Sequence, residues 1–387
     1  MNKIDSHKSI TKTIKKRLHR IVKKMINKTK SKNKKTPEGA LPNNNNIKLN
    51  ENENNRTKIN PSYSSKVGLE GKNQIFDENI ELEKEIGKGG SGLIYLGRLI
   101  KNSMRKVAAK HLKRNSKLFQ KMSQESYKDV VMNEVIIQSN SGYRHITKSL
   151  GYFTIDNDSY ILIQEYASNG NLKEFLTNLS KKIRWSKNTI SESLIGYIVY
   201  SLIIALRHLY YLDVIHQDIK PENILVDHNL EMKLTDFTVS VKLDVRKCYY
   251  HFLGNGTHGY MSPENLAHDN VIYKDALKND YYSLGVLIYK LFYGYFPYDI
   301  QQSDSKLEQL HKMRNNLLQF KYNEEPISDD LMNFLIGLLE IDYKKRLGIE
   351  EIFAHPWIKK VKNFYLCRQD YNCRNKFIID LYKDMAS

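Results

Sequence analysis

The sequence predicts an α+β fold, in which a small β-rich part is followed by a larger helical part and preceded by a disordered basic extension. From Phe76 to about Tyr166 the apolar residues fall mostly in short β-type runs, whereas after Asn171 they recur mostly at helical spacing. Before Phe76 the chain is rich in Lys, Asn, Ser and Thr. Hydrophobic residues make up 41% of the 387, so the chain after this extension can build a packed core.

The first 75 residues contain a candidate helix and a polar tract. Between residues 8 and 27 the apolar residues recur at spacings of three and four, with Lys and Arg on the opposite face. Three uses are open: a nascent helix in a solvated tail, a helix that binds an anionic membrane surface or a calmodulin-like partner, or a nuclear or nucleic-acid targeting segment. Residues 28 to about 74 have too little apolar surface to offset their ordering entropy, so we expect disorder there.

The positive charge belongs to this extension. The net charge is +18, and residues 1–58 hold 17 Lys and Arg against 4 Asp and Glu. The rest of the chain is therefore only weakly basic, and we expect no nucleic-acid partner for it.

Several features predict an intracellular, cytoplasmic protein, with peripheral membrane or nuclear association through the extension as the open alternatives. No run approaches 18 apolar residues, and no apolar region of a secretory signal follows Met1. Asn2 stands where myristoylation requires glycine. Three cysteines cannot form a disulfide framework and lack zinc-ligand spacing, which indicates free thiols in a reducing compartment.

The β-rich part is expected to hold five strands and one helix. The strand-like runs are 80–86, 93–99, 106–111, 148–154 and 160–164, and the helix is expected at 124–139. Later helical patterns include 191–211 and 280–292.

A glycine-rich segment joins the first two predicted strands. Gly87, Gly89 and Gly92 form a G-x-G-x-x-G pattern, which alone is weak because dinucleotide sites share it. A dinucleotide site continues into a helix, whereas residues 93–96 predict a strand. Glycines between two strands form a hairpin whose backbone N–H groups can approach phosphates closely. The candidate phosphate-binding residues are Ile86, Gly87, Lys88, Gly89, Gly90, Ser91 and Gly92.

Lys110 is the candidate cation for those phosphates. It ends the Val-Ala-Ala-Lys run 107–110 on the next strand, from which it would reach the α- and β-phosphates. A buried ammonium needs a partner, and Glu134 in the predicted helix is the candidate, although a surface glutamate is the other interpretation.

The segment 216–226, His-Gln-Asp-Ile-Lys-Pro-Glu-Asn-Ile-Leu-Val, carries the strongest chemical signal. Asp218 can accept the proton of a substrate hydroxyl, Lys220 can neutralise the transferring phosphoryl group, and Asn223 offers an amide oxygen to a metal ion. Asp236 follows and can bridge Mg²⁺ to the phosphates. Phosphoryl transfer needs mainly positioning and charge cancellation, so these segments in this order predict phosphoryl transfer with ATP and Mg²⁺.

On these motifs the chain resembles the eukaryotic protein kinase family over about residues 76–359. Arg346 stands where the family's late arginine pairs with a glutamate, here Glu264. The resemblance implies a bilobal protein kinase fold and phosphorylation of Ser or Thr in protein substrates, which Lys220 and Thr257 favour over Tyr. Three parts are expected: an N-lobe at 76–166, a C-lobe at 167–359 and a tail at 360–387. The segment 338–358 is most similar to the calmodulin-dependent group.

The resemblance also implies an adenine pocket. Gln164 would be the gatekeeper residue, and the backbone from Glu165 to Ala167 would bind the adenine edge. The apolar residues around the base would be Ile94, Ala108 and Leu225. Taken singly, each of these three residues is better explained by core packing. Only their positions relative to the kinase motifs favour the pocket.

Three positions depart from the family pattern. Gln217 replaces the Arg that, in the family, pairs with a phosphate on the activation loop. A phosphate on that loop would therefore have no cation from this position to order it. Thr238 replaces the Gly after Asp236-Phe237, which removes backbone freedom but no catalytic group. Gln138 stands where an aliphatic residue usually packs, unless the predicted helix register is off by one.

None of these departures removes a phosphate, metal or base residue, so an active kinase is favoured over a catalytically weak pseudokinase that acts as a binding scaffold. Kinases that select Arg before the target residue use several acidic groups. Here Glu222 keeps one of them, whereas Asn171 and Lys290 stand at two others. We therefore expect at most a weak preference for basic residues.

Overall fold

The computed structural model describes residues 74–77, 80–99, 105–139, 143–156, 159–183, 190–315 and 327–367. All of these residues except Cys367 belong to one compact unit, Pro61–Leu366. The predicted helix at 8–27 and residues 368–387 lie outside the described residues. So does the segment from 28 to about 74 that was expected to be disordered, except for Gln74, which begins a strand.

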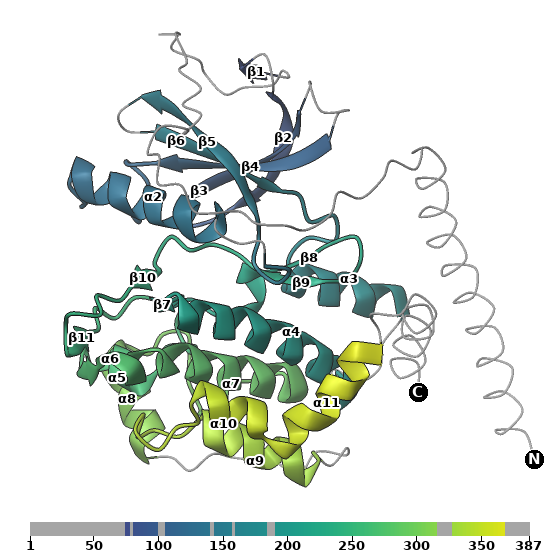
Figure 1. Cartoon of the computed structure of the whole chain (residues 1–387), viewed down its shortest axis with the longest axis vertical. Helices are drawn as coiled ribbons and strands as arrows, with labels where there is room; N and C mark the ends of the chain where they lie inside the picture. Colours follow the sequence, from purple (N-terminus) through teal and green to yellow (C-terminus); the bar gives the residue numbers. More distant parts are fainter. Residues whose placement is uncertain are drawn as a thin grey trace, which may run out of the picture. The chain divides into compact units, whose positions relative to one another are not determined.

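The β-rich lobe is an antiparallel sheet of order β1-β2-β3-β4-β6-β5 with helix α2 (Gln124–Ser139) beside it (Figure 1). All five predicted strands and the predicted helix are present, within two residues at each end. Strand β1 was not predicted. The strands are β1 (Gln74–Asp77), β2 (Ile80–Lys88), β3 (Gly92–Leu99), β4 (Arg105–Lys113), β5 (Ser149–Asp156) and β6 (Ser159–Glu165).

Alternation along the strands gives this sheet two different faces. Val107, Ala109, Ile161 and Ile163 pack with other residues in one cluster, whereas Leu112 and Leu162 pack with α2 residues in another. Because side chains of a strand alternate between faces, residues 108, 110 and 112 share the side of α2. The strand periodicity thus directs Lys110 toward that helix.

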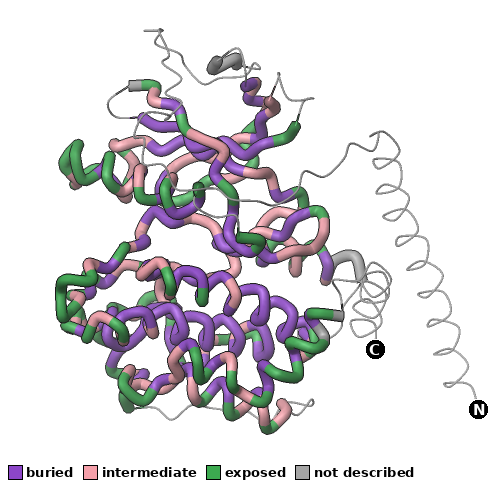
Figure 2. The backbone as a smooth tube through the Cα atoms, viewed as in Figure 1, coloured by how far each residue is buried: buried purple, intermediate pink, exposed green. Residues whose placement is uncertain are grey.

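The second lobe is mainly helical, and its core is formed by α4 and α7, which are mostly buried (Figure 2). Helix α4 is long and apolar enough to span a membrane, but 78% of its apolar window is buried inside the domain. Packing therefore accounts for its composition. The helices are α3 (Leu172–Ile183), α4 (Glu192–Tyr211), α5 (Pro263–Leu266), α6 (Tyr273–Ala276), α7 (Lys278–Tyr293), α8 (Lys306–Asn315), α9 (Asp329–Leu338), α10 (Ile349–Ala354) and α11 (Pro356–Cys367).

Short elements between α4 and α7 carry the catalytic segment. They are β7 (Val214–Ile215), the 3-10 turn η1 (Pro221–Asn223), β8 (Ile224–Val226), β9 (Met232–Leu234), β10 (Val241–Lys242), β11 (Tyr249–His251) and β12 (Asn270–Ile272). In the β8–β9 hairpin Ile224 lies opposite Leu234. The residues just outside this hairpin, Asn223 and Asp236, are therefore brought to the same end of it.

The predicted pair of Arg346 and Glu264 is present and fully buried. Arg346 Nη1 and Nη2 donate to the two carboxylate oxygens of Glu264 at 2.6 and 2.9 Å. Its Nε and Nη1 also donate to the carbonyl oxygens of Glu340 and Lys278, at 3.0 Å each. The pair joins α5 to the start of α7 and to the segment between α9 and α10.

Candidate active site

The glycine-rich segment forms the expected hairpin between β2 and β3. Gly89 and Gly92 exchange backbone hydrogen bonds of 2.9 and 3.4 Å across the turn. A Cβ at Gly92 would lie 1.9 Å from the carbonyl oxygen of His111 on β4, so only glycine fits there. A Cβ at Gly89 or Gly90 would meet nothing within 4 Å, which leaves the tip of the hairpin open to a ligand.

Lys110 and Glu134 form a buried ion pair. Lys110 Nζ lies 2.8 and 3.0 Å from the two carboxylate oxygens of Glu134, and their side chains are 5% and 0% exposed. Burial alone would lower the pKa of Lys110, but the charges of Asp236 and Glu134 raise it above its ordinary value. The ammonium is therefore fully charged, as a phosphate-binding group must be.

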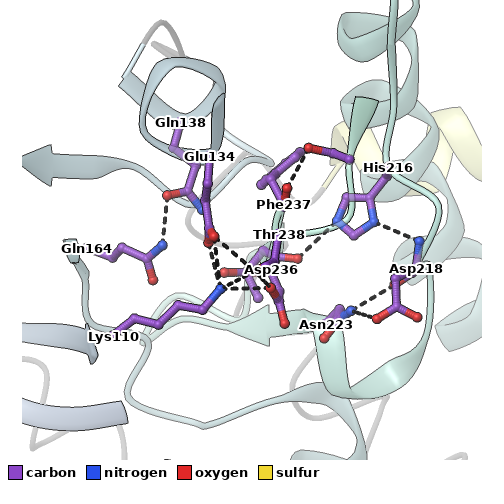
Figure 3. A network of polar contacts seen from close by, with 12 residues as sticks. Lys110, Glu134, Gln138, Gln164, His216, Asp218, Asn223, Asp236, Phe237 and Thr238 are labelled. Atoms are coloured by element: carbon purple, nitrogen blue, oxygen red, sulfur yellow. Dashed lines mark hydrogen bonds and ion pairs between the residues drawn. The ribbon is translucent and has the colours of Figure 1, made fainter. Parts of the chain in front are cut away.

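Asp236 completes this cluster from the other lobe (Figure 3). Its Oδ1 accepts a 2.7 Å hydrogen bond from Lys110 Nζ, and its backbone is left-handed, with φ of 63°. This conformation is rare outside glycine and marks a position held by its surroundings. Burial would raise the pKa of Asp236, but Lys110 and the hydroxyl of Thr238 outweigh it and hold the pKa far below its usual range.

A second cluster surrounds Asp218. Its Oδ2 accepts hydrogen bonds from Lys220 Nζ at 2.7 Å and Asn223 Nδ2 at 2.8 Å. Its Oδ1 accepts one from Thr257 Oγ1 at 2.5 Å, and Lys220 also donates to Thr257 at 2.6 Å. Hydrogen bonds from three side chains thus fix the orientation of this carboxylate.

Asp280 of α7 holds the backbone before Asp218 in place. The amides of His216 and Gln217 donate to the two oxygens of Asp280 at 2.6 and 2.9 Å. Gln217 has φ of 67°, and these two bonds hold it in that conformation. His216 Nδ1 accepts from the amide of Asp218, and its Nε2 donates to the carbonyl of Thr235, so the ring links both acidic segments (Figure 3).

Gln217 uses its side chain on the activation segment. Its Nε2 donates to the carbonyl oxygen of Val239 at 2.8 Å, and its side chain also bonds the hydroxyl of Tyr250. The residue therefore contacts the start of β11 and the backbone after Thr238 through neutral groups. No charge is involved in either contact.

Two glutamines meet behind the predicted adenine pocket. Gln164 Nε2 donates to Gln138 Oε1 at 2.7 Å, and the two side chains are 5% and 0% exposed (Figure 3). Gln138 lies four residues after Glu134 and therefore on the same helix face, so the predicted register is correct. That Gln138 weakens the packing stays a prediction; its Oε1 accepts the hydrogen bond from Gln164.

The remaining pocket residues come from two sheets. Ile94 and Ala108 are on β3 and β4, opposite Lys110 and Leu96 respectively, and Leu225 is on β8. Glu165 ends β6, and its carboxylate binds Lys233 Nζ at 2.9 Å. The N–H of Ala167 has no acceptor among the described residues, so it is available to an adenine edge.

Asn223 and Asp236 fit a magnesium ion. Within the described part of the chain, neither Asn223 Oδ1 nor Asp236 Oδ2 receives a hydrogen bond, and Asp236 is one-third exposed. No group of three or more His, Cys, Asp or Glu gathers among the same residues. One carboxylate and one amide oxygen suit Mg²⁺, which takes its other ligands from phosphates and water.

Next to Asp218 lies a surface of mixed charge. Glu222 is paired with Lys173 at 2.8 Å, and both are exposed. Lys290 Nζ lies 3.9 Å from the ring centre of Phe296 and 5.3 Å from that of Tyr260. Burial and the charge of Lys173 lower the pKa of Lys290, whereas Glu222 raises it, so the three charges lie close together.

The structure thus brings the predicted phosphate, metal and base residues into two linked clusters. Sequence reasoning missed Lys173 as the partner of Glu222, although both residues were visible. It also missed the contacts of the Thr238 hydroxyl with Glu134 and Lys110, because these residues lie 104 and 128 positions away.

Comparisons with known proteins agree on one family. A profile described as "Protein kinase domain" matches residues 80–358. The Aurora kinase of Eremothecium gossypii is 30% identical over 290 residues, which cover 74% of this chain and 71% of that protein. A mitogen-activated protein kinase kinase, SIPKK, of Nicotiana tabacum is 28% identical, with 74% and 75% covered. The serine/threonine-protein kinase CLA4 of Candida albicans is 27% identical over 71% of this chain and 26% of its own length.

Proposed function

Because this chain belongs to the protein kinase family and is a serine/threonine protein kinase, we propose that its two linked clusters catalyse transfer of the γ-phosphate of Mg·ATP to Ser or Thr of protein substrates. One observation carries the proposal. The Lys110–Glu134–Asp236 cluster and the Asp218–Lys220–Asn223 cluster meet at one end of the β8–β9 hairpin, where Asn223 and Asp236 each present an open oxygen.

Each residue has one task in this proposal. Bound Mg·ATP supplies the phosphoryl group, and the metal ion neutralises its charge. Lys110, kept charged by Glu134, binds the α- and β-phosphates under the glycine hairpin. Asp236 and Asn223 hold the metal ion. Asp218 accepts the proton of the substrate hydroxyl, and Lys220, 2.7 Å from it, stabilises the negative charge that develops.

The test is phosphate incorporation into a protein substrate by the full chain. We expect Asp218→Asn, Asp236→Ala, Lys110→Met and Asn223→Ala each to lower the rate by about 10²-fold or more, since each removes a group that positions or stabilises charge. Asp330→Asn, a partly buried aspartate of α9 paired with Lys360, is the matched control and should keep the wild-type rate. Wild-type activity in Asp218→Asn would show that the base is wrongly assigned.

The second candidate function is a scaffold with little catalysis, and the substitutions at Gln217 and Thr238 favour it. It predicts that the wild type binds nucleotide but incorporates no more phosphate than Asp236→Ala. Mg·ATP-dependent incorporation by the wild type, lost in Asp236→Ala, would rule this candidate out.

The contacts of Gln217 support a form of regulation. The side chain already holds the activation segment through Val239 and Tyr250 with neutral hydrogen bonds. Since a neutral glutamine, and not a cation, makes this contact, activity should not depend on phosphorylation of this segment.

The surface around Glu222 supports a substrate preference. Lys173 already neutralises Glu222, and Lys290 adds positive charge beside Tyr260, which follows Thr257 by one turn. An Arg of a substrate would gain at most a weak exposed pair and would meet repulsion from Lys290. The proposal is a weak or absent basic preference and tolerance of acidic residues before the target.

The extension completes the proposal. Residues 8–27 would bind an anionic membrane surface or a calmodulin-like protein, which would give an intracellular kinase a peripheral membrane location. Closeness to the calmodulin-dependent group, based on 338–358, stays a prediction, since the relatives above are Aurora, CLA4 and mitogen-activated kinase kinases.

A further inference from the structure

Thr238 places a hydroxyl inside the buried charge cluster (Figure 3). Its Oγ1 lies 2.8 Å from Lys110 Nζ, 3.0 Å from Glu134 Oε2 and 2.5 Å from Asp236 Oδ1. The residue is 5% exposed. A hydroxyl therefore contacts every charged group of the cluster, at a position that the sequence pattern marked only as a loss of glycine.

The protons of the cluster fit this arrangement. The ammonium of Lys110 carries three protons and faces Glu134, Asp236 and Thr238, so it can donate to each. The hydroxyl accepts from Lys110 and donates its one proton to a carboxylate. Asp236 Oδ1 then receives two hydrogen bonds, one from Lys110 and one from Thr238.

This double contact decides which oxygen of Asp236 remains open. With Oδ1 held from two directions, Oδ2 is the oxygen left for a metal ion, and the left-handed backbone at Asp236 depends on such support. The side chain of Thr238 is itself restricted, because it is β-branched and buried. Because Lys110 Nζ donates both to this hydroxyl and to Glu134, the lysine joins Thr238 and Asp236 to helix α2.

We propose that Thr238 is a positioning residue for metal binding, whose hydroxyl fixes the orientation of Asp236 and, through Lys110, couples it to Glu134 on α2. The proposal rests on the proposed function, in which Asp236 is a magnesium ligand. It predicts that removal of the hydroxyl raises the Mg²⁺ concentration that the kinase requires, beyond any effect on the melting temperature.

Two measurements on the full chain test this. The first is the Mg²⁺ concentration for half-maximal kinase activity at saturating ATP. The second is binding of a fluorescent, non-hydrolysable ATP analogue with Mg²⁺ and with EDTA, which does not require turnover.

The variants are Thr238→Val, which replaces the hydroxyl by a methyl group, Thr238→Ser, which keeps the hydroxyl, and Thr238→Gly, which removes the side chain. The control is Thr147→Val, because Thr147 is fully buried and its hydroxyl has no partner among the described residues.

Thr238→Val and Thr238→Gly should raise the half-maximal Mg²⁺ concentration about tenfold or more, since one hydrogen bond to charged groups is worth at least about that factor. Both should weaken analogue binding in Mg²⁺ but not in EDTA. Thr238→Ser should keep the half-maximal Mg²⁺ concentration within about threefold of the wild-type value. Thr147→Val should match the wild type.

An unchanged Mg²⁺ requirement in Thr238→Val, or a failure of Thr238→Ser to restore it, would overturn the proposal. A lower melting temperature with the wild-type Mg²⁺ requirement would also overturn it, since that result shows a structural role only. If the wild type binds the analogue with Mg²⁺ but transfers no phosphate, the proposed function fails while the binding measurement still decides the role of Thr238.

Discussion

Replacement of Arg346 by methionine should be among the most destabilising single changes in the helical lobe. Arg346 and Glu264 are 0% and 2% exposed, and Arg346→Met removes both hydrogen bonds to the carboxylate. The carbonyl oxygens of Glu340 and Lys278 lose their donor as well. Because the charge of Glu264 is then buried without a partner, the expected loss is about 3–5 kcal/mol of unfolding free energy.

Thermal unfolding followed by circular dichroism measures this. At roughly 2–4 °C per kcal/mol for a domain of a few hundred residues, the midpoint should fall by about 10 °C. The control is Lys173→Met, which breaks a pair of which the members are 66% and 40% exposed. An exposed pair is worth about 0–1 kcal/mol, so this variant should unfold within a few degrees of the wild type.

The double variant Arg346→Met/Glu264→Leu distinguishes the cost of burying the unpaired charge of Glu264 from the cost of losing the hydrogen bonds. Because a buried ion pair can be replaced by apolar residues at little cost, the double variant should recover most of the midpoint. The reasoning is refuted if the losses of unfolding free energy in Arg346→Met and Glu264→Leu simply add in the double variant. It is also refuted if Arg346→Met lowers the unfolding free energy by less than about 1 kcal/mol.

Three further predictions concern regulation and recognition. Enzyme treated with phosphatase should keep its activity, because Gln217 contacts Val239 through neutral groups; a tenfold fall that kinase pretreatment restores would contradict this. A peptide of residues 8–27 should gain helix on anionic vesicles or with Ca²⁺-calmodulin at low salt, each basic residue near an anionic surface contributing about 1 kcal/mol; no gain with either partner would leave a solvated tail. An arrayed peptide library should show no strong selection for Arg two or three residues before the target, and Lys290→Glu should introduce one; strong Arg selection by the wild type would show that the surface is wrongly interpreted.

Much of the fold follows from local sequence patterns. The alternation of residues 106–111 directs Lys110 toward α2, and the four-residue spacing of Glu134 and Gln138 puts both on one face of that helix. The glycine hairpin was predicted because its second strand excludes the helix of a dinucleotide site. These inferences need only strand and helix periodicity.

The contacts that distinguish this chain could not be predicted in this way. Gln138 and Gln164 lie on different elements, and each alone looks like a polar residue at an apolar position. Thr238 looked like a loss of backbone freedom, since nothing local shows that its hydroxyl reaches Glu134, which is 104 residues away. Such contacts depend on how distant elements pack against one another, which sequence periodicity does not show.

The buried pair of Gln138 and Gln164 has a consequence for chemical inhibitors. A compound that extends an apolar group past Gln164 would have to separate the 2.7 Å hydrogen bond and leave amide groups buried without partners. Each such group costs about 1–3 kcal/mol, enough to cancel much of the gain from the apolar group. A compound that presents its own donor and acceptor to the two amides would avoid this loss. Inhibitor chemistry for this kinase should therefore favour polar groups at the back of the predicted adenine pocket.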